Sequence, residues 1–130
     1  MTFQFSQTIY VADTDLAGVV YHANYIKFME AARVDMLSRI GYPYHQLQEQ
    51  HIGLVPIHID IKYKSPLRLE NRFTVHTKYL SHTPAKISFQ QDVMHQDTLC
   101  TTATITLAAI NQRSFKPIRI PENLISKLCR

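Results

Sequence analysis

Residues 24–43 read NYIKFMEAARVDMLSRIGYP, and this stretch decides the fold. Its apolar side chains recur at steps of three and four, which places them on one stripe of an α-helix. The members of this stripe are Tyr25, Phe28, Met29, Ala32, Met36, Leu37 and Ile40. Asn24 or a residue just before it is expected to cap the start, and Gly41 followed by Pro43 is expected to end the helix. A stripe of this length has to be covered by another part of the chain.

Strand-like segments surround this helix. Apolar residues alternate with mostly polar ones at the beginning of the chain, which is the period of a half-buried strand; they are Phe3, Phe5, Ile9 and Val11. Further strands are predicted at residues 57–63, 72–80, 86–94 and 99–110, the last two as a hairpin. Short helices are predicted at residues 43–50 and after Pro121.

This order of one strand, one long helix and four strands predicts the α+β class. Consecutive strands with short connections favour an antiparallel sheet, and the simplest packing wraps that sheet around the helix. Such a sheet keeps two edges and one less protected face. We therefore expect a homo-oligomer, a homodimer or a homotetramer, that pairs edges or stacks faces.

The composition is that of an ordinary globular protein. The chain has 130 residues, of which 45% are hydrophobic and 18% charged, and a single domain over residues 1–130 is expected. Cys100 and Cys129 lie far apart without a CxxC pair, which favours free thiols and a cytoplasmic location. We expect neither a signal peptide nor a membrane span. The net charge of +4 suits an anionic partner, which nucleic acid, an acidic membrane face or a phosphorylated small molecule would satisfy.

Chemically versatile residues concentrate in YVADTDLAGVVYHANY, residues 10–25. As a calcium loop, this segment would use Asp13, Asp15 and Gly18 at the first, third and sixth positions. The remaining positions do not fit, because Ala17 is the fifth and Asn24 stands where a bidentate Glu is needed. No metal is therefore expected here. The other histidines show no ligand-like spacing either.

The same segment strongly resembles the hotdog-fold acyl-CoA thioesterases, in the group that contains hydroxybenzoyl-CoA thioesterase and the short thioesterases linked to the bacterial Tol-Pal system. The matching residues are 13–15, 17–25 and 28–33, with a weaker match at 63–69. The chain departs from the family pattern at Ala12, where an acidic residue is common, and at Glu70-Asn71, where Gly-Asp or Asp-Asp is frequent. The resemblance implies a hotdog fold and thioester hydrolysis without a cofactor.

The resemblance also implies roles for individual residues. Asp15 matches the catalytic position, and an aspartate is ordinarily ionised at neutral pH, so it can attack the thioester carbonyl or activate water. Backbone N–H groups around Tyr21 and His22, at the positive end of the helix, would polarise the carbonyl oxygen. The ring of His22 is open to three interpretations: it orients Asp15, contacts substrate or fills the helix end. Asp13 is expected to hold the turn through backbone hydrogen bonds.

The substrate implied is acyl-CoA or an acyl carrier protein thioester. Coenzyme A carries phosphates, so Lys86 and Arg68 are candidate contacts for its nucleotide end, with Lys86 preferred because related thioesterases place basic residues near this strand start. Binding of nucleic acid is disfavoured, because the basic residues are scattered without interleaved aromatics. The alternative function is a non-hydrolytic module that binds acyl-CoA or acyl carrier protein. A hotdog dehydratase would resemble a different, His-centred motif.

Overall fold

The computed structural model describes residues 2–129. The strands are β1 (Thr2–Thr8), β2 (Ile52–Tyr63), β3 (Arg72–His82), β4 (Lys86–His95) and β5 (Thr98–Asn111). The helices are α1 (Asn24–Arg39), α2 (Tyr44–Glu49) and α3 (Glu122–Leu128), preceded by the short 3-10 helix η1 (Val11–Asp13). The long helix, the second helix and strands β3, β4 and β5 therefore form close to where the sequence pattern predicts them, and β2 begins earlier than predicted.

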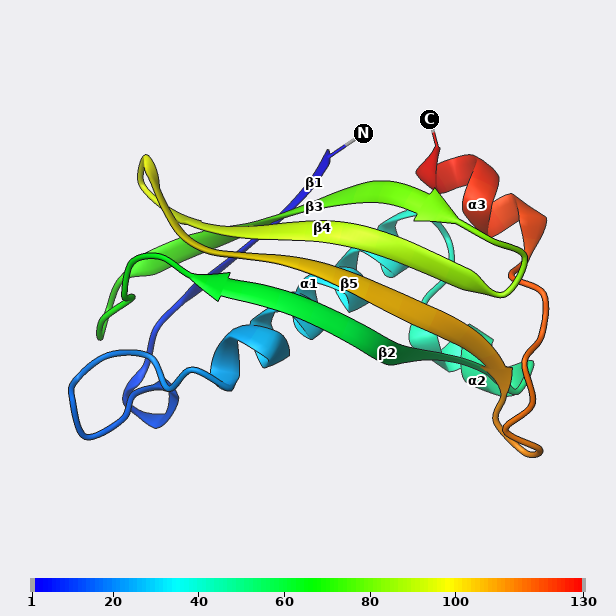
Figure 1. Ribbon diagram of the computed structural model, residues 1–130, viewed down its shortest axis with the longest axis horizontal. Helices are drawn as coiled ribbons and strands as arrows, with labels where there is room; N and C mark the ends of the chain where they lie inside the picture. Colours follow the sequence, from blue (N-terminus) through cyan, green and yellow to red (C-terminus); the bar gives the residue numbers. More distant parts are fainter. Residues whose placement is uncertain (1, 130) are drawn as a thin grey trace.

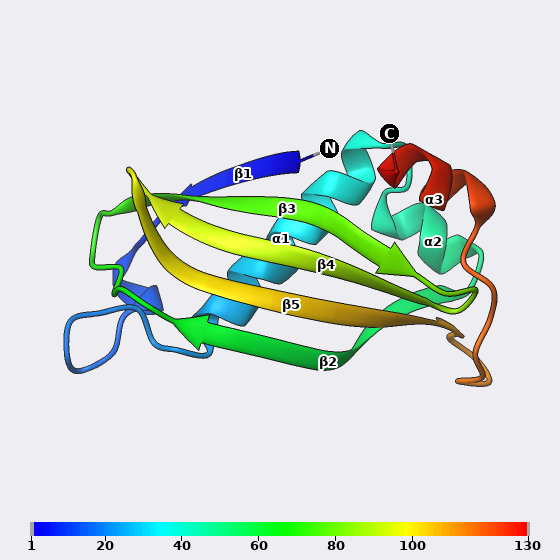
Figure 2. The ribbon, with the colours of Figure 1, turned by 45° about the horizontal axis from the view of Figure 1, so that its top comes forward.

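All five strands belong to one antiparallel sheet with the order β1-β3-β4-β5-β2. The sheet curves around α1, which crosses its concave side, while α2 and α3 lie at the end away from the start of α1 (Figures 1 and 2). This is the hotdog arrangement, so the predicted α+β class is confirmed. Because α1 points its first turn at one end of the sheet, the loops before and beside that turn are brought together there.

The core lies between α1 and the concave face of the sheet. The stripe predicted on α1 is buried apart from Ile40, which packs against the core while partly exposed. It meets large side chains from the central strands, among them Phe73, Phe89 and Ile105. The rings of Phe28 and Phe73 are 4.7 Å apart, within the range of favourable aromatic pairs. Burial of this stripe supplies most of the driving force that holds α1 on the sheet.

One polar cluster is buried inside this core. Arg33 is only 3% exposed, and its Nη1 donates to Oε1 of the fully buried Gln91 at 2.9 Å. The amide nitrogen of Gln91 donates in turn to the Met29 carbonyl and to the Thr77 hydroxyl, both at 2.9 Å. Burial lowers the pKa of Arg33 from its ordinary value, while Tyr44 and Glu30 act in the opposite direction. The neutral amide of Gln91 is thus the partner of a buried cation.

The opening strand ends earlier than its alternating pattern predicts. β1 stops at Thr8, and Val11 lies in η1 with 72% of its surface exposed. The Tyr10 N–H donates to the Asp13 carboxylate at 2.9 Å, which favours a tight turn over a continued strand. Asn24 is the first residue of α1, and the N-cap position is held by the residue just before it, Ala23, which makes no side-chain bond.

Strand β2 is longer than the predicted residues 57–63. It begins at Ile52 and pairs with β5 along its whole length, with an irregular register between Pro56 and His58. Ile57 falls at this bulge and is 50% exposed, so it does not share the half-buried face of Ile59 and Ile61. β2 also forms an outer edge of the sheet, which leaves one side of its backbone unpaired within the described chain.

Candidate active site

Asp15 begins a tight hairpin between η1 and α1. Its N–H donates to the Val19 carbonyl at 2.9 Å, and the Gly18 N–H donates back to the Asp15 carbonyl at 3.1 Å. Gly18 has φ +78°, the left-handed conformation that closes a three-residue hairpin loop and that favours glycine. The Asp15 Oδ1 accepts the Ala17 N–H at 2.8 Å, as in an Asx-turn. Among residues 2–129, no donor occupies the second oxygen, Oδ2.

The residues around this hairpin fix it to the helix and to the link between β2 and β3. Asp13 has the structural role expected of it, since its carbonyl accepts the Tyr21 N–H at 3.0 Å and the Asn24 side-chain amide at 2.9 Å. The Val20 N–H donates to the Leu67 carbonyl at 2.8 Å, which binds the hairpin to that link. The Asp15 turn is therefore held from two directions.

The start of α1 offers backbone donors to this region. Within the described chain, neither His22 nor Ala23 donates its N–H to a protein acceptor, as is usual for the first turn of a helix. The Tyr21 N–H is already bonded to the Asp13 carbonyl, so the expectation that it is a free donor is wrong. The His22 ring is exposed and lies against the Tyr21 ring, with centroids 4.6 Å apart.

Asp15 and His22 line one surface cavity of about 340 Å³. The other lining residues are Val19, Val20, Tyr25, Tyr63, Lys64, Ser65 and Pro66. Tyr25 is almost fully buried at this cavity, and its hydroxyl accepts the Leu67 N–H at 3.2 Å. Burial raises the pKa of Tyr25, and the Leu67 N–H partly opposes this. A carboxylate, free amide donors and a lysine thus border the same space.

The two basic residues predicted to bind substrate lie in different places. Arg68 forms an isolated bridge with Val19, so its backbone adjoins the Asp15 hairpin. Lys86 begins β4 opposite Ala108, which pairs with Val55 near the start of β2. Eight residues separate Val55 from Tyr63, a distance of roughly 26 Å along a strand. Lys86 and the Asp15 cavity are therefore at opposite ends of the same sheet.

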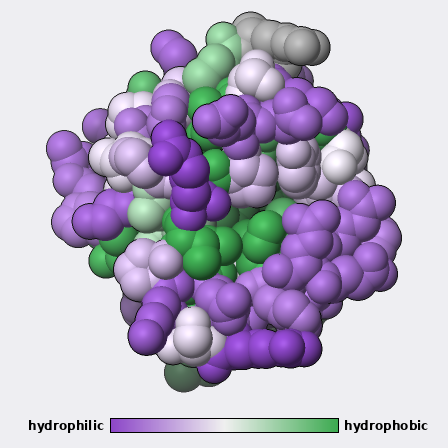
Figure 3. Space-filling model, turned by 90° about the vertical axis from the view of Figure 1, so that its right-hand side faces the viewer, coloured by the Kyte–Doolittle hydropathy of each residue, from purple (hydrophilic) through white to green (hydrophobic). Residues whose placement is uncertain are grey.

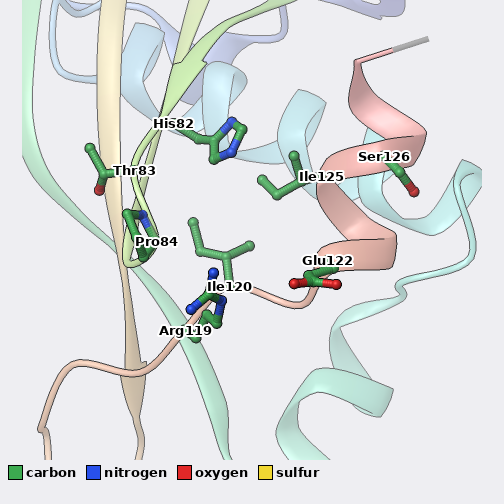
Figure 4. A pocket seen from close by; sticks show the side chains of 8 residues that line it. All are labelled: His82, Thr83, Pro84, Arg119, Ile120, Glu122, Ile125 and Ser126. Carbon is green, nitrogen blue, oxygen red and sulfur yellow. The ribbon is translucent and has the colours of Figure 1, made fainter.

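A second cavity, of about 300 Å³, lies at the Lys86 end between the β3–β4 turn and α3. Figure 4 shows His82 from one side of it and Arg119 and Glu122 from the other. Figure 3 views this end of the molecule, where apolar atoms gather inside a hydrophilic rim. Lys86 belongs to the same turn, because its N–H donates to the Thr83 hydroxyl at 3.2 Å. This end thus carries Arg119 and the acidic Glu122 at a partly apolar hollow, with Lys86 on the adjoining turn.

Two other features are absent from residues 2–129. No group of three or more His, Cys, Asp or Glu side chains is arranged to hold a metal ion. None of the helices in this range has the length and apolar character needed to cross a membrane. Cys100 and Cys129 are both free, as their spacing predicts.

Residues 10–128 match the thioesterase-like superfamily. The chain belongs to this family. It is 31% identical over 123 residues to the acyl-CoA thioesterase YbgC of Haemophilus influenzae, covering 94% of this chain and 90% of the relative. It is 27% identical over 126 residues to the acyl-CoA thioester hydrolase YbgC of Escherichia coli, covering 96% and 94%. The crystal structure of a probable thioesterase from Bartonella henselae superposes with TM-score 0.89 at 32% identity, covering 93% and 100%.

In this member of the thioesterase-like superfamily, Tyr63 is a cavity residue whose role the local sequence pattern does not predict. Tyr63 lines the cavity, and its hydroxyl donates to the His22 carbonyl at 3.1 Å. The two residues are 41 positions apart, so only the tertiary fold shows that they meet. The alternation of Ile59, Ile61 and Tyr63 does place this ring on the helix-facing side of the sheet.

Proposed function

We propose that the protein hydrolyses acyl-CoA, using water to cleave the thioester into a free acid and coenzyme A. The observation that carries this proposal is the shared cavity, in which the Asp15 carboxylate and the His22 end of α1 lie together. Membership of the thioesterase-like superfamily supports it, as do the relatives described as acyl-CoA thioesterases. No cofactor is needed for this reaction, because a carboxylate and amide donors supply what acyl transfer requires.

Asp15 provides the attacking or proton-accepting group through its free Oδ2. In one route, Oδ2 attacks the carbonyl carbon, the thiolate leaves, and water hydrolyses the resulting mixed anhydride. In the other, Oδ2 takes a proton from water, the water oxygen attacks, and the departing thiolate receives that proton. Both routes need the carboxylate to keep its orientation, which the bond from the Ala17 N–H to Oδ1 provides.

The His22 N–H is the donor that we assign to the thioester oxygen. That oxygen becomes negatively charged in the tetrahedral intermediate, and the positive end of α1 adds to the stabilisation. Removal of one such donor in other enzymes costs about 2.7–4 kcal/mol of barrier. Because the donor is a backbone group, His22 acts here without its ring. We assign Tyr21 no donor role, since its N–H is already paired.

The nucleotide end of coenzyme A requires a contribution from a second copy of the chain. β2 is an edge strand that exposes Ile57 and Tyr63, and antiparallel pairing of two β2 strands would cover this edge. Such pairing sets the start of one β2 beside the end of the other. Lys86 of the partner subunit would then lie toward the same end of the dimer as the Asp15 cavity. Arg68 would come from the same chain as Asp15. A homodimer is thus the smallest assembly that completes the proposed site, and stacking of two dimers would give a homotetramer.

The test measures release of free thiol from a panel of acyl-CoA and acyl carrier protein thioesters. Asp15→Asn should lower kcat at least about a hundredfold, the usual contribution of a catalytic base. Asp35→Asn is the matched control, because Asp35 lies on α1 and its only ion pair within residues 2–129 is with Arg39 at 2.9 Å. Full activity of Asp15→Asn would refute the assignment. Saturable binding of acyl-CoA by the wild type without any thiol release would instead favour the non-hydrolytic binding module.

We also place the reaction in the cytoplasm. The support is that both cysteines are free, since exposed and buried thiols persist in a reducing compartment.

A further inference from the structure

Tyr63 links the edge strand β2 to residues 21–23, which immediately precede α1. It is the last residue of β2, and its hydroxyl donates to the His22 carbonyl at 3.1 Å. Its ring meets the His22 and Tyr25 rings edge-on, with centroids 6.3 Å and 5.6 Å apart. No other side chain of the described residues donates to the carbonyls of residues 21–23. Tyr63 is therefore the side-chain support of this short segment.

The two partners of this bond differ in how firmly they are held. Tyr63 pairs with Thr101 in the ladder between β2 and β5, and the next two N–H groups, of Lys64 and Ser65, both donate to the Cys100 carbonyl. Apart from the Tyr63 bond, the segment of residues 21–23 is held by backbone bonds at Tyr21 and Asn24 and by the Asn24 side-chain amide on the Asp13 carbonyl, and Ala23 provides no side-chain cap. The sheet end is thus the rigid partner, and the helix start is the part that needs to be held.

From this geometry we infer that Tyr63 is a positioning residue for the thioester carbonyl, which rests on the hydrolysis proposed above. The His22 carbonyl belongs to the planar peptide that ends at the Ala23 nitrogen. Fixing that carbonyl sets the direction of the Ala23 N–H, which lies in the same peptide plane, and restricts ψ of His22, the residue whose own N–H is assigned to the thioester oxygen. A donor to a developing negative charge is effective because it is oriented before the reaction. Tyr63 thereby acts on the reaction through the backbone.

A purely structural role for Tyr63 gives a different expectation. The side chain is 49% exposed, so water can replace its hydroxyl at the His22 carbonyl with little loss of folding stability. If the bond served stability alone, removing the Tyr63 hydroxyl would lower the melting temperature. A bond that orients the cavity donors would show its loss in kcat, because those donors bind the transition state more strongly than the bound thioester.

The experiment compares Tyr63→Phe with the wild type, Asp15→Asn and Tyr42→Phe, using one acyl-CoA. Tyr63→Phe keeps the ring and removes the hydroxyl; we expect kcat to fall about tenfold, the loss expected for one hydrogen bond. KM should stay within about twofold, and the melting temperature and the pH profile should match those of the wild type. Tyr42→Phe removes the hydroxyl of a ring that Lys127 overlies at 5.4 Å, beyond the C-terminal end of α1 and away from the cavity, and should leave kcat unchanged.

Three results would count against this inference. A kcat of Tyr63→Phe within twofold of the wild type would overturn it, as would a loss confined to KM or a loss matched by a lower melting temperature. If Asp15→Asn is inactive while Tyr63→Phe is fully active, only the role of Tyr63 fails and hydrolysis stands. If the wild type releases no thiol from any thioester, the proposed function fails and the role of Tyr63 falls with it.

Discussion

Replacement of Gln91 by leucine tests how the core accommodates its buried cation. Gln91 is fully buried and bonds Arg33, the Met29 carbonyl and the Thr77 hydroxyl, each at 2.9 Å. Leucine has nearly the same volume, so the change removes three hydrogen bonds without opening a large cavity. The change also removes the Gln91 acceptor from the Arg33 guanidinium. The Nε of Arg33 already has no hydrogen-bond partner among the described residues.

The expected loss follows from these contacts. A buried hydrogen bond to a charged group contributes about 1.5–3 kcal/mol, and each neutral one about 1 kcal/mol. The Met29 carbonyl belongs to the interior of α1 and retains its helical bond. The loss of the additional bond from Gln91 therefore adds little. Gln91→Leu should therefore cost about 3–4 kcal/mol of unfolding free energy. Arg33→Met removes the buried charge as well as a partner, so the double variant should recover at least half of that loss.

Urea unfolding of the four proteins at one fixed protein concentration measures these quantities and their coupling. The m-values should agree, so that a changed midpoint reports stability. Gln90→Leu is the matched control: Gln90 is the preceding residue on the opposite face of β4, where its half-buried amide donates to the Asp92 carboxylate at 3.3 Å, and its change should cost at most about 1 kcal/mol. A loss below about 1 kcal/mol for Gln91→Leu, or simple additivity with Arg33→Met, would refute the view that the amide compensates the cation.

Two further changes test other parts of the molecule. Lys86→Ala should raise KM for acyl-CoA about fivefold, because one phosphate contact is lost, and leave KM for the matching pantetheine thioester unchanged; equal effects on both substrates would remove Lys86 from the nucleotide site. Burial raises the pKa of Tyr44 above 10.0, so its contribution to stability is complete below that pH and is lost as the pH rises through the higher folded value. Tyr44→Phe should flatten the fall in unfolding free energy above pH 10, and an unchanged slope would contradict this.

The local patterns of the sequence predict the elements that depend on local chemistry. The apolar stripe of α1 and its Gly41 end are periodic or conformational signals, and both are found in the structure. The Asp15 segment is also local: the turn, the glycine and the helix start lie within ten residues of one another. This proximity in sequence is why the motif of residues 15–24 predicts that Asp15 and His22 border one cavity.

The errors arise where tertiary pairing or a single side chain overrides the pattern. The alternation through Val11 predicts a longer β1, but the Asp13 carboxylate binds the Tyr10 N–H and turns the chain. The pattern of β2 weakens before Ile57 because of the bulge, while pairing with β5 continues back to Ile52. Propensity describes how each residue fits a strand, whereas the register of the neighbouring strand decides where the strand begins.

Tyr63 shows why the supporting residues of a site are harder to predict than its reacting residues. Asp15 is predicted as the reacting carboxylate because its segment resembles the catalytic motif of the thioesterase family, and its neighbours in sequence are its neighbours in space. Tyr63 is one aromatic at the end of a strand, and its significance depends on a carbonyl 41 residues away. The same holds for Gln91, which is 58 residues from the arginine that it binds. Such residues become visible only when the curvature of the sheet brings its strands against α1, so the fold must be known before they can be assigned.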